Sequence, residues 1–412
     1  MRLDILSCLF VASASASVLS RGRYRLKPYT LNLESEVPRM LQLISNTHLP
    51  EAPEYPGLSS DAGIPLSTLK SLRTQWLTQF DWKKEQASIN KYPQFTAEIE
   101  GLTVHFVHKK STARNAIPLI LFHGWPGSFL EFLPLVDDLT KEGKTSNGKS
   151  VSFDVIVPNL PGFGLSSAPP GNWTNHDTAR VFNTLMTDVL GYKKYATHGT
   201  DWGCATAYDL YDSYNSTVRA THLASLPFVP LTPDQLAAEG IKLDGLETFE
   251  EESFVEWSTN GYAYFQQETT KPNTIGLALY DNPVGQLAYI GEKFLNLKPV
   301  GSDPRAGTGP SVLTHNGILT SVSLYYLTKS FISSGFTYYQ NRFATNYTKA
   351  KTDAPLLFSS FKYNILFWPA ALVKQTGNLV AYKNHDFGGH FPALDNPPAM
   401  ISDLREIGCY WK

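Results

Sequence analysis

The chain has 412 residues, with 35 Lys and Arg against 37 Asp and Glu, so its formal net charge is -2. Proteins that bind nucleic acids usually carry a basic excess that neutralises phosphates, and this near-balance argues against that class. Aromatic residues make up 13% of the sequence, which argues against a predominantly disordered chain. The length suits two or three structural units, or one large α/β domain with an insertion.

The N-terminal segment has the pattern of a signal peptide. An apolar run from Ile5 to Val11 precedes small Ala and Ser residues up to Ser17, and it is shorter than the roughly 20 apolar residues that span a bilayer. We therefore predict a signal peptide over residues 1–20 and a protein that is secreted or stays in the secretory pathway. Glycosylation sequons begin at Asn172, Asn215 and Asn346 and suit that route, although the pattern is permissive.

Three units follow the predicted leader. Residues 21–110 contain many prolines and turns and predict an N-terminal meander that packs on the core. Short apolar runs alternate with helical patterns over residues 111–230, and strand-like runs return over residues 341–412. This alternation is typical of a mostly parallel sheet in an α/β fold. Residues 231–340 are rich in helical patterns and aromatic residues and predict a helical cap inserted into that core.

The segment Gly199-Thr200-Asp201-Trp202-Gly203 follows a strand-like run and precedes a helical one. Small residues on both sides of a central side chain permit the tight strand-to-helix turn that exposes a nucleophile. Here the nucleophile is a carboxylate, which attacks an sp3 carbon to give an alkyl ester and so fits the opening of an epoxide or a haloalkane. The alternative is that Asp201 only caps the following helix.

A second turn, His123-Gly124-Trp125-Pro126-Gly127, follows the apolar run from Pro118 to Phe122. The carboxyl end of a parallel strand is where α/β sheets bind ligands. The backbone N–H groups of Trp125 and Trp202 are the expected oxyanion hole for a tetrahedral intermediate on esterified Asp201. We interpret His123 as a structural turn residue.

His390 follows two glycines near the end of the chain, after the last strand-like run. A neutral imidazole can deprotonate a water molecule that then attacks the ester, so His390 is the expected general base. We assign structural or surface positions to four other histidines, His198, His222, His315 and His385.

Taken together, these motifs resemble the microsomal-type epoxide hydrolases of the α/β-hydrolase superfamily over nearly the whole chain after the leader. The segments from Asp81 to Phe95 and from Leu102 to His108 resemble the family's N-terminal region, and residues 159–166 resemble a loop of its core. The resemblance implies an α/β-hydrolase fold with a mostly parallel sheet, a helical cap and an N-terminal meander.

The resemblance also implies two ring-opening tyrosines in the cap. Spacing to Lys271-Pro272 points to Tyr264, with Tyr262 as its rival, and the segment from Ser333 to Tyr339 points to Tyr338, with Tyr339 as its rival. Two phenol O–H groups can hold and protonate the alkoxide that forms when an epoxide opens.

The sequence departs from the family at the acid that should orient the catalytic histidine. Aligning the family pattern to residues 367–372 puts Ala371 where the family has Asp or Glu. The histidine's partner is therefore unknown, and Asp386, Asp353 and Asp234 are candidates among which nothing local decides.

The leading hypothesis is an epoxide hydrolase that opens an apolar epoxide to a vicinal diol through an ester on Asp201. A second hypothesis is a biosynthetic cyclase that directs an internal nucleophile of its substrate onto the epoxide. A third hypothesis is a catalytically impaired relative that binds an apolar ligand. A haloalkane dehalogenase would use the same Asp and His, but its halide site would not need paired tyrosines.

Neither a cofactor nor a metal is implied by these motifs. Cys8, Cys204 and Cys409 form no CxxC pair, so neither a disulfide framework nor a zinc cluster is expected. The expected partner is a small apolar epoxide, with no nucleic acid and no stable membrane span. A homodimer is compatible with the sequence, which does not specify the oligomeric state.

Overall fold

The computed structural model describes residues 24–57, 62–296 and 311–412, so the predicted signal peptide over residues 1–20 lies outside the described part. Nine strands form one sheet in the order β1-β2-β3-β7-β4-β8-β9-β10-β11. The strands of this sheet are β1 (Leu26–Tyr29), β2 (Gln94–Ile99), β3 (Leu102–Lys109), β4 (Ile117–Phe122), β7 (Phe153–Pro158), β8 (Tyr195–Gly199), β9 (Val218–Leu223), β10 (Pro355–Tyr363) and β11 (Asn378–Gly389). Strands β5 (Gly143–Lys144) and β6 (Ser150–Val151) form a separate ribbon.

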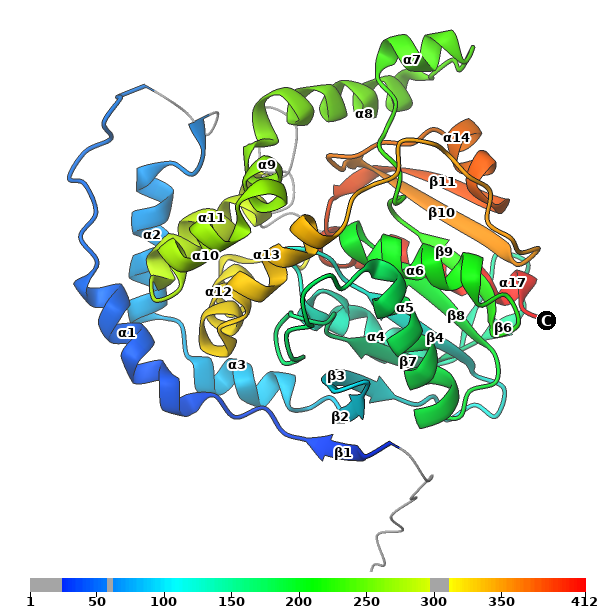
Figure 1. Ribbon diagram of the computed structural model, residues 1–412, viewed down its shortest axis with the longest axis horizontal. Coiled ribbons are helices and arrows are strands. Elements are labelled where there is room, and N and C mark those ends of the chain that lie inside the picture. The colour runs from blue at the N-terminus through cyan, green and yellow to red at the C-terminus, as the bar shows by residue number, and fades with distance from the viewer. Residues whose placement is uncertain (1–23, 58–61, 297–310) are drawn as a thin grey trace, which may run out of the picture.

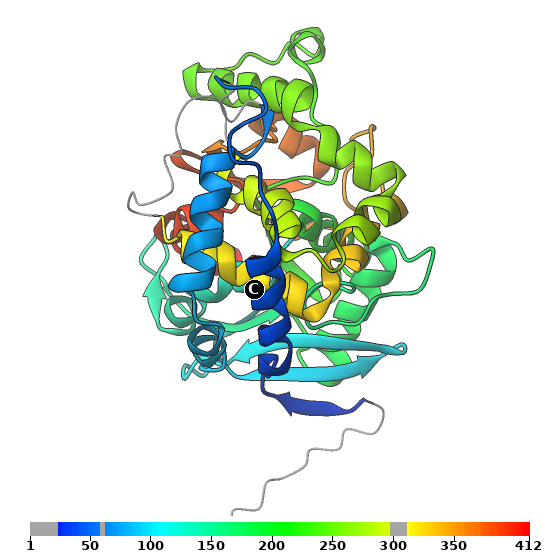
Figure 2. The same ribbon diagram turned by 90° about the vertical axis from the view of Figure 1, so that its left-hand side faces the viewer.

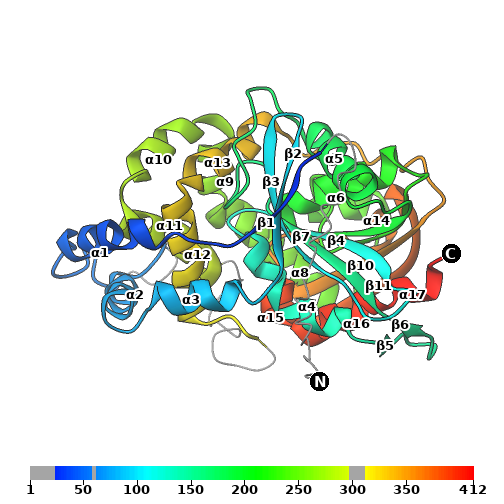
Figure 3. The same ribbon diagram turned by 90° about the horizontal axis from the view of Figure 1, so that it is seen from below.

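The six strands from β7 to β11 in the sheet order, β7-β4-β8-β9-β10-β11, are parallel to one another, which confirms the mostly parallel sheet. Strands β4 and β7 are near-continuous apolar runs, because helices cover both faces of the sheet. Figure 3 shows α5, α6 and α14 on one face and α4, α16 and α17 on the other. The helices of the core are α4 (Leu133–Thr140), α5 (Asn175–Thr184), α6 (Asp201–Ser213), α14 (Ala370–Thr376), α15 (Pro392–Asp395), α16 (Pro397–Arg405) and α17 (Ile407–Tyr410).

Helices α7 to α13 form one group between β9 and β10 and lie beyond the carboxyl ends of the parallel strands (Figure 1). They are α7 (Pro233–Ala238), α8 (Gly245–Glu256), α9 (Ala263–Thr270), α10 (Pro272–Leu279), α11 (Pro283–Asn296), α12 (His315–Thr328) and α13 (Ser330–Gln340). Two short 3₁₀ helices, η1 (Glu34–Glu36) and η3 (Phe129–Phe132), and two π-helical segments, η4 (Leu185–Val189) and η5 (Trp257–Gly261), complete the elements. We call the group α7–α13 the cap.

The N-terminal region is more regular than a meander. Strands β1, β2 and β3 extend the sheet in antiparallel fashion at the edge beyond β7. Helices α1 (Val37–Asn46), α2 (Leu66–Thr78) and α3 (Trp82–Ile89) instead pack against α11 and α12 of the cap, as Figures 1 and 2 show. The indole N–H of buried Trp76 donates to Ser323 Oγ at 3.0 Å across this contact. The N-terminal region therefore braces the cap as well as the core.

In the described residues no helix is long and apolar enough to cross a lipid bilayer. Cys204 and Cys409 are free, so no disulfide joins them. The sequon residues Asn172, Asn215 and Asn346 are all exposed, and glycosylation at them remains a prediction.

Candidate active site

Asp201 lies at the tight turn between β8 and α6. Its backbone φ of 43° is in the left-handed region, an unfavourable conformation for a non-glycine residue that is found at functional turns. A Cβ on Gly203 would lie 2.1 Å from the Phe122 carbonyl oxygen, and one on Gly199 would lie 2.4 Å from the Gly203 carbonyl oxygen. Only glycine at both positions lets the turn approach β4 and its own helix this closely.

The alternative that Asp201 caps α6 is wrong. The N-cap residue is Thr200, which makes no side-chain capping hydrogen bond. The Asp201 carboxylate instead accepts a hydrogen bond from the backbone N–H of Trp125, with an N-to-Oδ1 distance of 2.7 Å. The side chain is 10% exposed and points to the turn after β4. Its position suits a nucleophile whose Oδ1 stays fixed.

The two expected oxyanion-hole residues differ in what the structure shows. The Trp125 N–H already contacts Oδ1 of Asp201. The Trp202 N–H belongs to the first turn of α6, where backbone N–H groups have no partner within the helix. Among the described residues no hydrogen bond joins it to Asp201, so its part in the oxyanion hole remains a prediction.

His123 has the structural position that the sequence predicts. Its Nδ1–H donates to the Gly124 carbonyl at 2.9 Å, and its Nε2 accepts from the Leu160 N–H at 3.1 Å. Burial lowers the pKa of His123 to about 4, so the ring is neutral at pH 7. The side chain ties the turn that carries Trp125 to the loop after β7.

His390 comes directly after β11 and faces the nucleophile. Its Nε2 lies 3.3 Å from Oδ2 of Asp201, and its side chain is 1% exposed. The opposite ring nitrogen, Nδ1, donates to the side-chain oxygen of Asn364 at 3.0 Å. A nucleophile, a base and an orienting group are therefore aligned, but the orienting group is an amide.

Asn364 is the position that the sequence interpretation missed. It is the first residue after β10, in the predicted loop, and is 5% exposed. Ala371, the residue aligned with the family's acid, is exposed in the first turn of α14. The strand-like run in the sequence ends at Phe361, and no sequence signal distinguishes Asn364 from Lys362, the first polar residue after that run.

None of the three carboxylates proposed as substitutes is the partner of His390. Asp386 is exposed on β11, Asp234 is exposed at the start of α7, and Asp353 pairs with Arg219 at 3.7 Å ahead of β10. A different carboxylate, that of Asp395, accepts from the backbone N–H groups of Gly389 and Phe391 at 3.1 and 3.3 Å. It therefore fixes the backbone on both sides of His390.

Tyr264 and Tyr338 lie together above the turn that carries Trp125. The Tyr264 ring stacks on the Trp125 indole with centroids 5.3 Å apart, and Tyr338 meets the same indole edge-on at 5.8 Å. Burial, with a contribution from the charge of Asp201, raises the pKa of both phenols well above the ordinary value. Both therefore keep their protons at neutral pH.

The rival tyrosines lie elsewhere. Tyr262 is half-buried and stacks on Phe265 at 4.8 Å, whereas Tyr339 is 52% exposed. Among the described residues, the Oη of Tyr338 makes no hydrogen bond of normal geometry, although it lies close enough to Trp202 and Tyr264 to interact with both. A developing alkoxide would be a stronger acceptor for its O–H.

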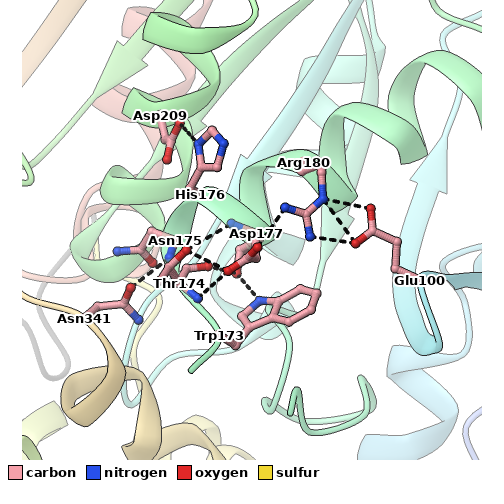
Figure 4. Close-up of polar contacts among 10 residues, drawn as sticks. Glu100, Trp173, Thr174, Asn175, His176, Asp177, Arg180, Asp209 and Asn341 are labelled. Atoms are coloured by element: carbon pink, nitrogen blue, oxygen red, sulfur yellow. Dashed lines mark hydrogen bonds and ion pairs between the residues drawn. The ribbon is translucent and has the colours of Figure 1, made fainter. Parts of the chain in front are cut away.

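Helix α13, which carries Tyr338, is anchored to the core at its carboxyl end. The backbone N–H of Asn175 donates to Asn341 Oδ1, and that of Trp173 donates to Gln340 Oε1, each at 2.8 Å. Figure 4 shows the contact with Asn341 beside the capped start of α5. Tyr338 is thus held on a rigid element.

Two buried ionisable side chains in the cap, Lys293 and Glu268, were not predicted. The Lys293 Nζ lies 4.5 Å from the centroid of the Tyr264 ring, and Lys293 is 6% exposed. Glu268 is 2% exposed, and burial raises the pKa of its carboxyl well above the ordinary value. No sequence pattern singled out either residue.

Within the described ranges, no group of three or more His, Cys, Asp or Glu side chains is arranged to hold a metal ion.

Comparison with known proteins identifies the family of this chain. The model of the epoxide hydrolase N terminus matches residues 26–132, and that of the alpha/beta hydrolase fold matches residues 117–269. Epoxide hydrolase 1 of Sus scrofa is 32% identical over 84% of this chain and 80% of its own length. Juvenile hormone epoxide hydrolase 2 of Ctenocephalides felis is 30% identical over 92% and 84%, respectively.

A solved structure of the Aspergillus niger epoxide hydrolase shares the fold, with a TM-score of 0.78 and 31% identity over 94% of this chain and 97% of that one. The α/β-hydrolase fold expected from the sequence is confirmed. The chain belongs to the epoxide hydrolase family, and its activity is the hydrolysis of an epoxide to a vicinal diol.

Proposed function

We propose that this epoxide hydrolase acts on a small apolar epoxide and that Asp201, Tyr264, Tyr338 and His390 carry the reaction. The strongest support for these roles is that the two carboxylate oxygens of Asp201 face different residues. Oδ1 is held by the Trp125 N–H, while Oδ2 faces His390 and is the oxygen free to attack. The aromatic surroundings of the tyrosines favour an apolar substrate.

In the first half-reaction, Oδ2 of Asp201 attacks an epoxide carbon and the carbon–oxygen bond of the ring breaks. The departing alkoxide takes a proton from Tyr264 or Tyr338, both of which are protonated at neutral pH. The product of this step is a hydroxyalkyl ester on Asp201. The phenolate regains its proton before the next turnover.

In the second half-reaction, Nε2 of His390 takes a proton from water as the water attacks the ester carbonyl carbon. The resulting oxyanion forms at Oδ1, beside the Trp125 N–H, with the Trp202 N–H as the proposed second donor. Collapse of this intermediate releases the diol, whose oxygen takes the proton back from the imidazolium, and leaves Asp201 as a carboxylic acid. That acid gives its proton to the phenolate, which restores the Asp201 carboxylate and the neutral tyrosine. The sum is one epoxide and one water converted to one diol.

A single turnover in ¹⁸O-labelled water tests this route. With enzyme in excess over styrene oxide, hydrolysis of an Asp201 ester puts ¹⁸O into the peptide that contains Asp201, and the first diol is unlabelled. Direct attack of water on the epoxide would put ¹⁸O into the first diol and leave Asp201 unlabelled, which would contradict the proposal.

One observation keeps cyclisation as a second candidate. His390 is oriented by an amide rather than a carboxylate, which weakens the step that uses water. A substrate with its own nucleophile near the epoxide would then cyclise without taking up solvent oxygen. Such a substrate would give a product free of ¹⁸O after many turnovers, whereas hydrolysis would label the diol.

We further propose that the protein enters the secretory pathway. The support is the apolar N-terminal run followed by small residues, together with three exposed sequons. N-terminal sequencing of protein made in its own host would find that the mature chain starts near residue 20. Treatment with a glycosidase would lower the mass of that protein. An intact Met1 on the mature, unglycosylated protein would contradict the proposal.

A further inference from the structure

Lys293 of α11 is a buried cation beside one of the two phenols. Its Nζ lies 4.5 Å from the centroid of the Tyr264 ring and 5.6 Å from that of the Tyr289 ring, and its side chain is 7% exposed. Nζ also donates to Glu292 Oε1 at 3.0 Å. A buried ammonium needs such a partner, because it has lost most of its hydration. The Tyr264 ring is thus in contact with a cation as well as with the Trp125 indole.

The second phenol has no such cation. In the described ranges, no lysine or arginine lies over the ring of Tyr338. Arg342, one turn further along the chain, donates to the backbone carbonyl oxygen of Tyr338 at 2.6 Å instead. Burial raises the pKa of the Glu268 carboxyl, which favours its neutral form, so Glu268 offsets little of the Lys293 charge. The two phenols therefore differ in the charge beside the ring.

Ring opening transfers a negative charge from Asp201 to a phenol. Asp201 is a carboxylate before this step and a neutral ester after it, while the proton donor becomes a phenolate. A cation over an aromatic ring attracts the neutral ring, and it attracts a phenolate more strongly because the ring then carries net negative charge. Only an interaction that strengthens during a step speeds that step. The contact between Lys293 and Tyr264 is of this kind.

On this basis, and resting on the covalent route proposed above, we infer that Lys293 is a positioning residue that makes Tyr264 the phenol that gives its proton to the alkoxide. The Oη–H bond of Tyr264 breaks, and the proton bonds to the departing epoxide oxygen. The phenolate stays beside the Lys293 ammonium until the acid form of Asp201 returns a proton to it. Tyr338 donates a hydrogen bond to the same oxygen and keeps its proton.

Single-turnover kinetics in a His390→Gln background test the inference, because the ester then accumulates and intact-protein mass reports how fast it forms. Enzyme is in excess over styrene oxide, and Lys293→Met removes the charge while keeping much of the side-chain volume. In Tyr338→Phe, where Tyr264 is the remaining donor, Lys293→Met lowers the maximal rate of adduct formation roughly ten-fold or more. The enzyme concentration that gives half of this rate stays nearly the same. In Tyr264→Phe, Lys293→Met has little effect.

Two further variants separate charge from packing. Lys293→Arg keeps a cation and holds the rate near that of the parent, so an Arg variant as slow as the Met variant would overturn the inference. Lys329→Met is the matched control and leaves the rate unchanged, because Lys329 lies between α12 and α13 with its Nζ 4.0 Å from the centroid of a different ring, that of Tyr326. Lys293→Gln replaces Lys293→Met in the comparison if the Met variant does not fold.

The role of Lys293 and the covalent route fail in different ways. Equal slowing by Lys293→Met in the Tyr264→Phe and Tyr338→Phe backgrounds overturns the inference, and so does an unchanged rate in Tyr338→Phe. In both cases an adduct still forms, so the ester on Asp201 stands. If the His390→Gln parent forms no adduct while the wild type releases diol, the ester is excluded, together with the inference that rests on it.

Discussion

The Nε2 atom of His390 lies 3.3 Å from Oδ2 of Asp201, the carboxylate oxygen that the Trp125 N–H does not hold. The base is therefore placed next to the ester bond that it must open and on the side opposite the expected oxyanion hole. Nucleophile and base come from the ends of β8 and β11, and both side chains are buried. In the proposed mechanism, Asp201 and the two phenols form the ester, whereas His390 is needed only to hydrolyse it.

His390→Gln is expected to open the epoxide and then stop. Ring opening needs Asp201 and the phenols, whereas removal of the base slows ester hydrolysis by about 10²- to 10⁴-fold. Intact mass after mixing with styrene oxide should show one substrate equivalent on the protein. Asp201→Asn is the control and should give neither adduct nor diol; full activity of Asp201→Asn would rule out the nucleophile.

Tyr338→Phe is expected to slow adduct formation by roughly ten- to a hundred-fold, because one of two proton donors to the alkoxide is lost. Tyr264→Phe should act in the same way, and the double variant should form almost no adduct. Tyr339→Phe is the matched control, since that side chain is adjacent in sequence but 52% exposed. Equal effects of Tyr338→Phe and Tyr339→Phe would contradict the assignment.

Much of the site could be predicted because its parts lie in short continuous segments. The glycines around Asp201 and the turn that carries Trp125 are set by backbone geometry, and backbone geometry leaves a local sequence pattern. The choice of Tyr264 and Tyr338 over their neighbours follows from the family resemblance, because the spacing to nearby motifs matches the family's. In each case the functional residue and the sequence motif that identifies it lie only a few positions apart in the chain.

Asn364, Lys293 and the packing of α1–α3 on the cap could not be predicted in this way. Asn364 is identified by a contact with His390, 26 positions away along the chain. The sequence was searched for a carboxylate, and Asn364 carries an amide. An amide oxygen can accept the hydrogen bond from His390 but has no negative charge. Lys293 lies over the Tyr264 ring only after the cap helices have packed, and no local pattern records such a contact.

Gly124→Ala is expected to abolish adduct formation. A Cβ at this position would lie 2.0 Å from Oδ1 of Asp201, so either the turn that carries Trp125 or the nucleophile must move. A shift of about 1 Å is enough to lower the rate of a positioned reaction by roughly 100-fold. Gly171→Ala is the control, because its added Cβ would meet no atom within 4 Å. Circular dichroism should separate loss of geometry from loss of fold, and a Gly124→Ala variant with normal adduct formation would contradict the prediction.

Glu250 joins the cap to the sheet and should make stability depend on pH. This α8 residue is 1% exposed and accepts hydrogen bonds from Ser360 Oγ of β10 at 2.6 Å and Asn384 Nδ2 of β11 at 2.7 Å. Burial raises the pKa of its carboxyl from 4.5 to about 7. The folded protein therefore keeps this proton over a pH range in which the unfolded chain has lost it.

Since the folded-state pKa is the higher one, the contribution of Glu250 to the free energy of unfolding is fully present below pH 4.5 and is lost as the pH rises through about 7. The loss amounts to at most about 3 kcal/mol, from 1.36 kcal/mol per pKa unit. Urea unfolding between pH 4.5 and 8 should show this decline in the wild type relative to Glu250→Gln, which cannot titrate. Glu252→Gln, an exposed change on the same helix, should keep the wild-type dependence. Parallel pH profiles for the wild type and Glu250→Gln would mean that Glu250 is already ionised in the folded protein and that α8 is held to β10 and β11 by a charged carboxylate.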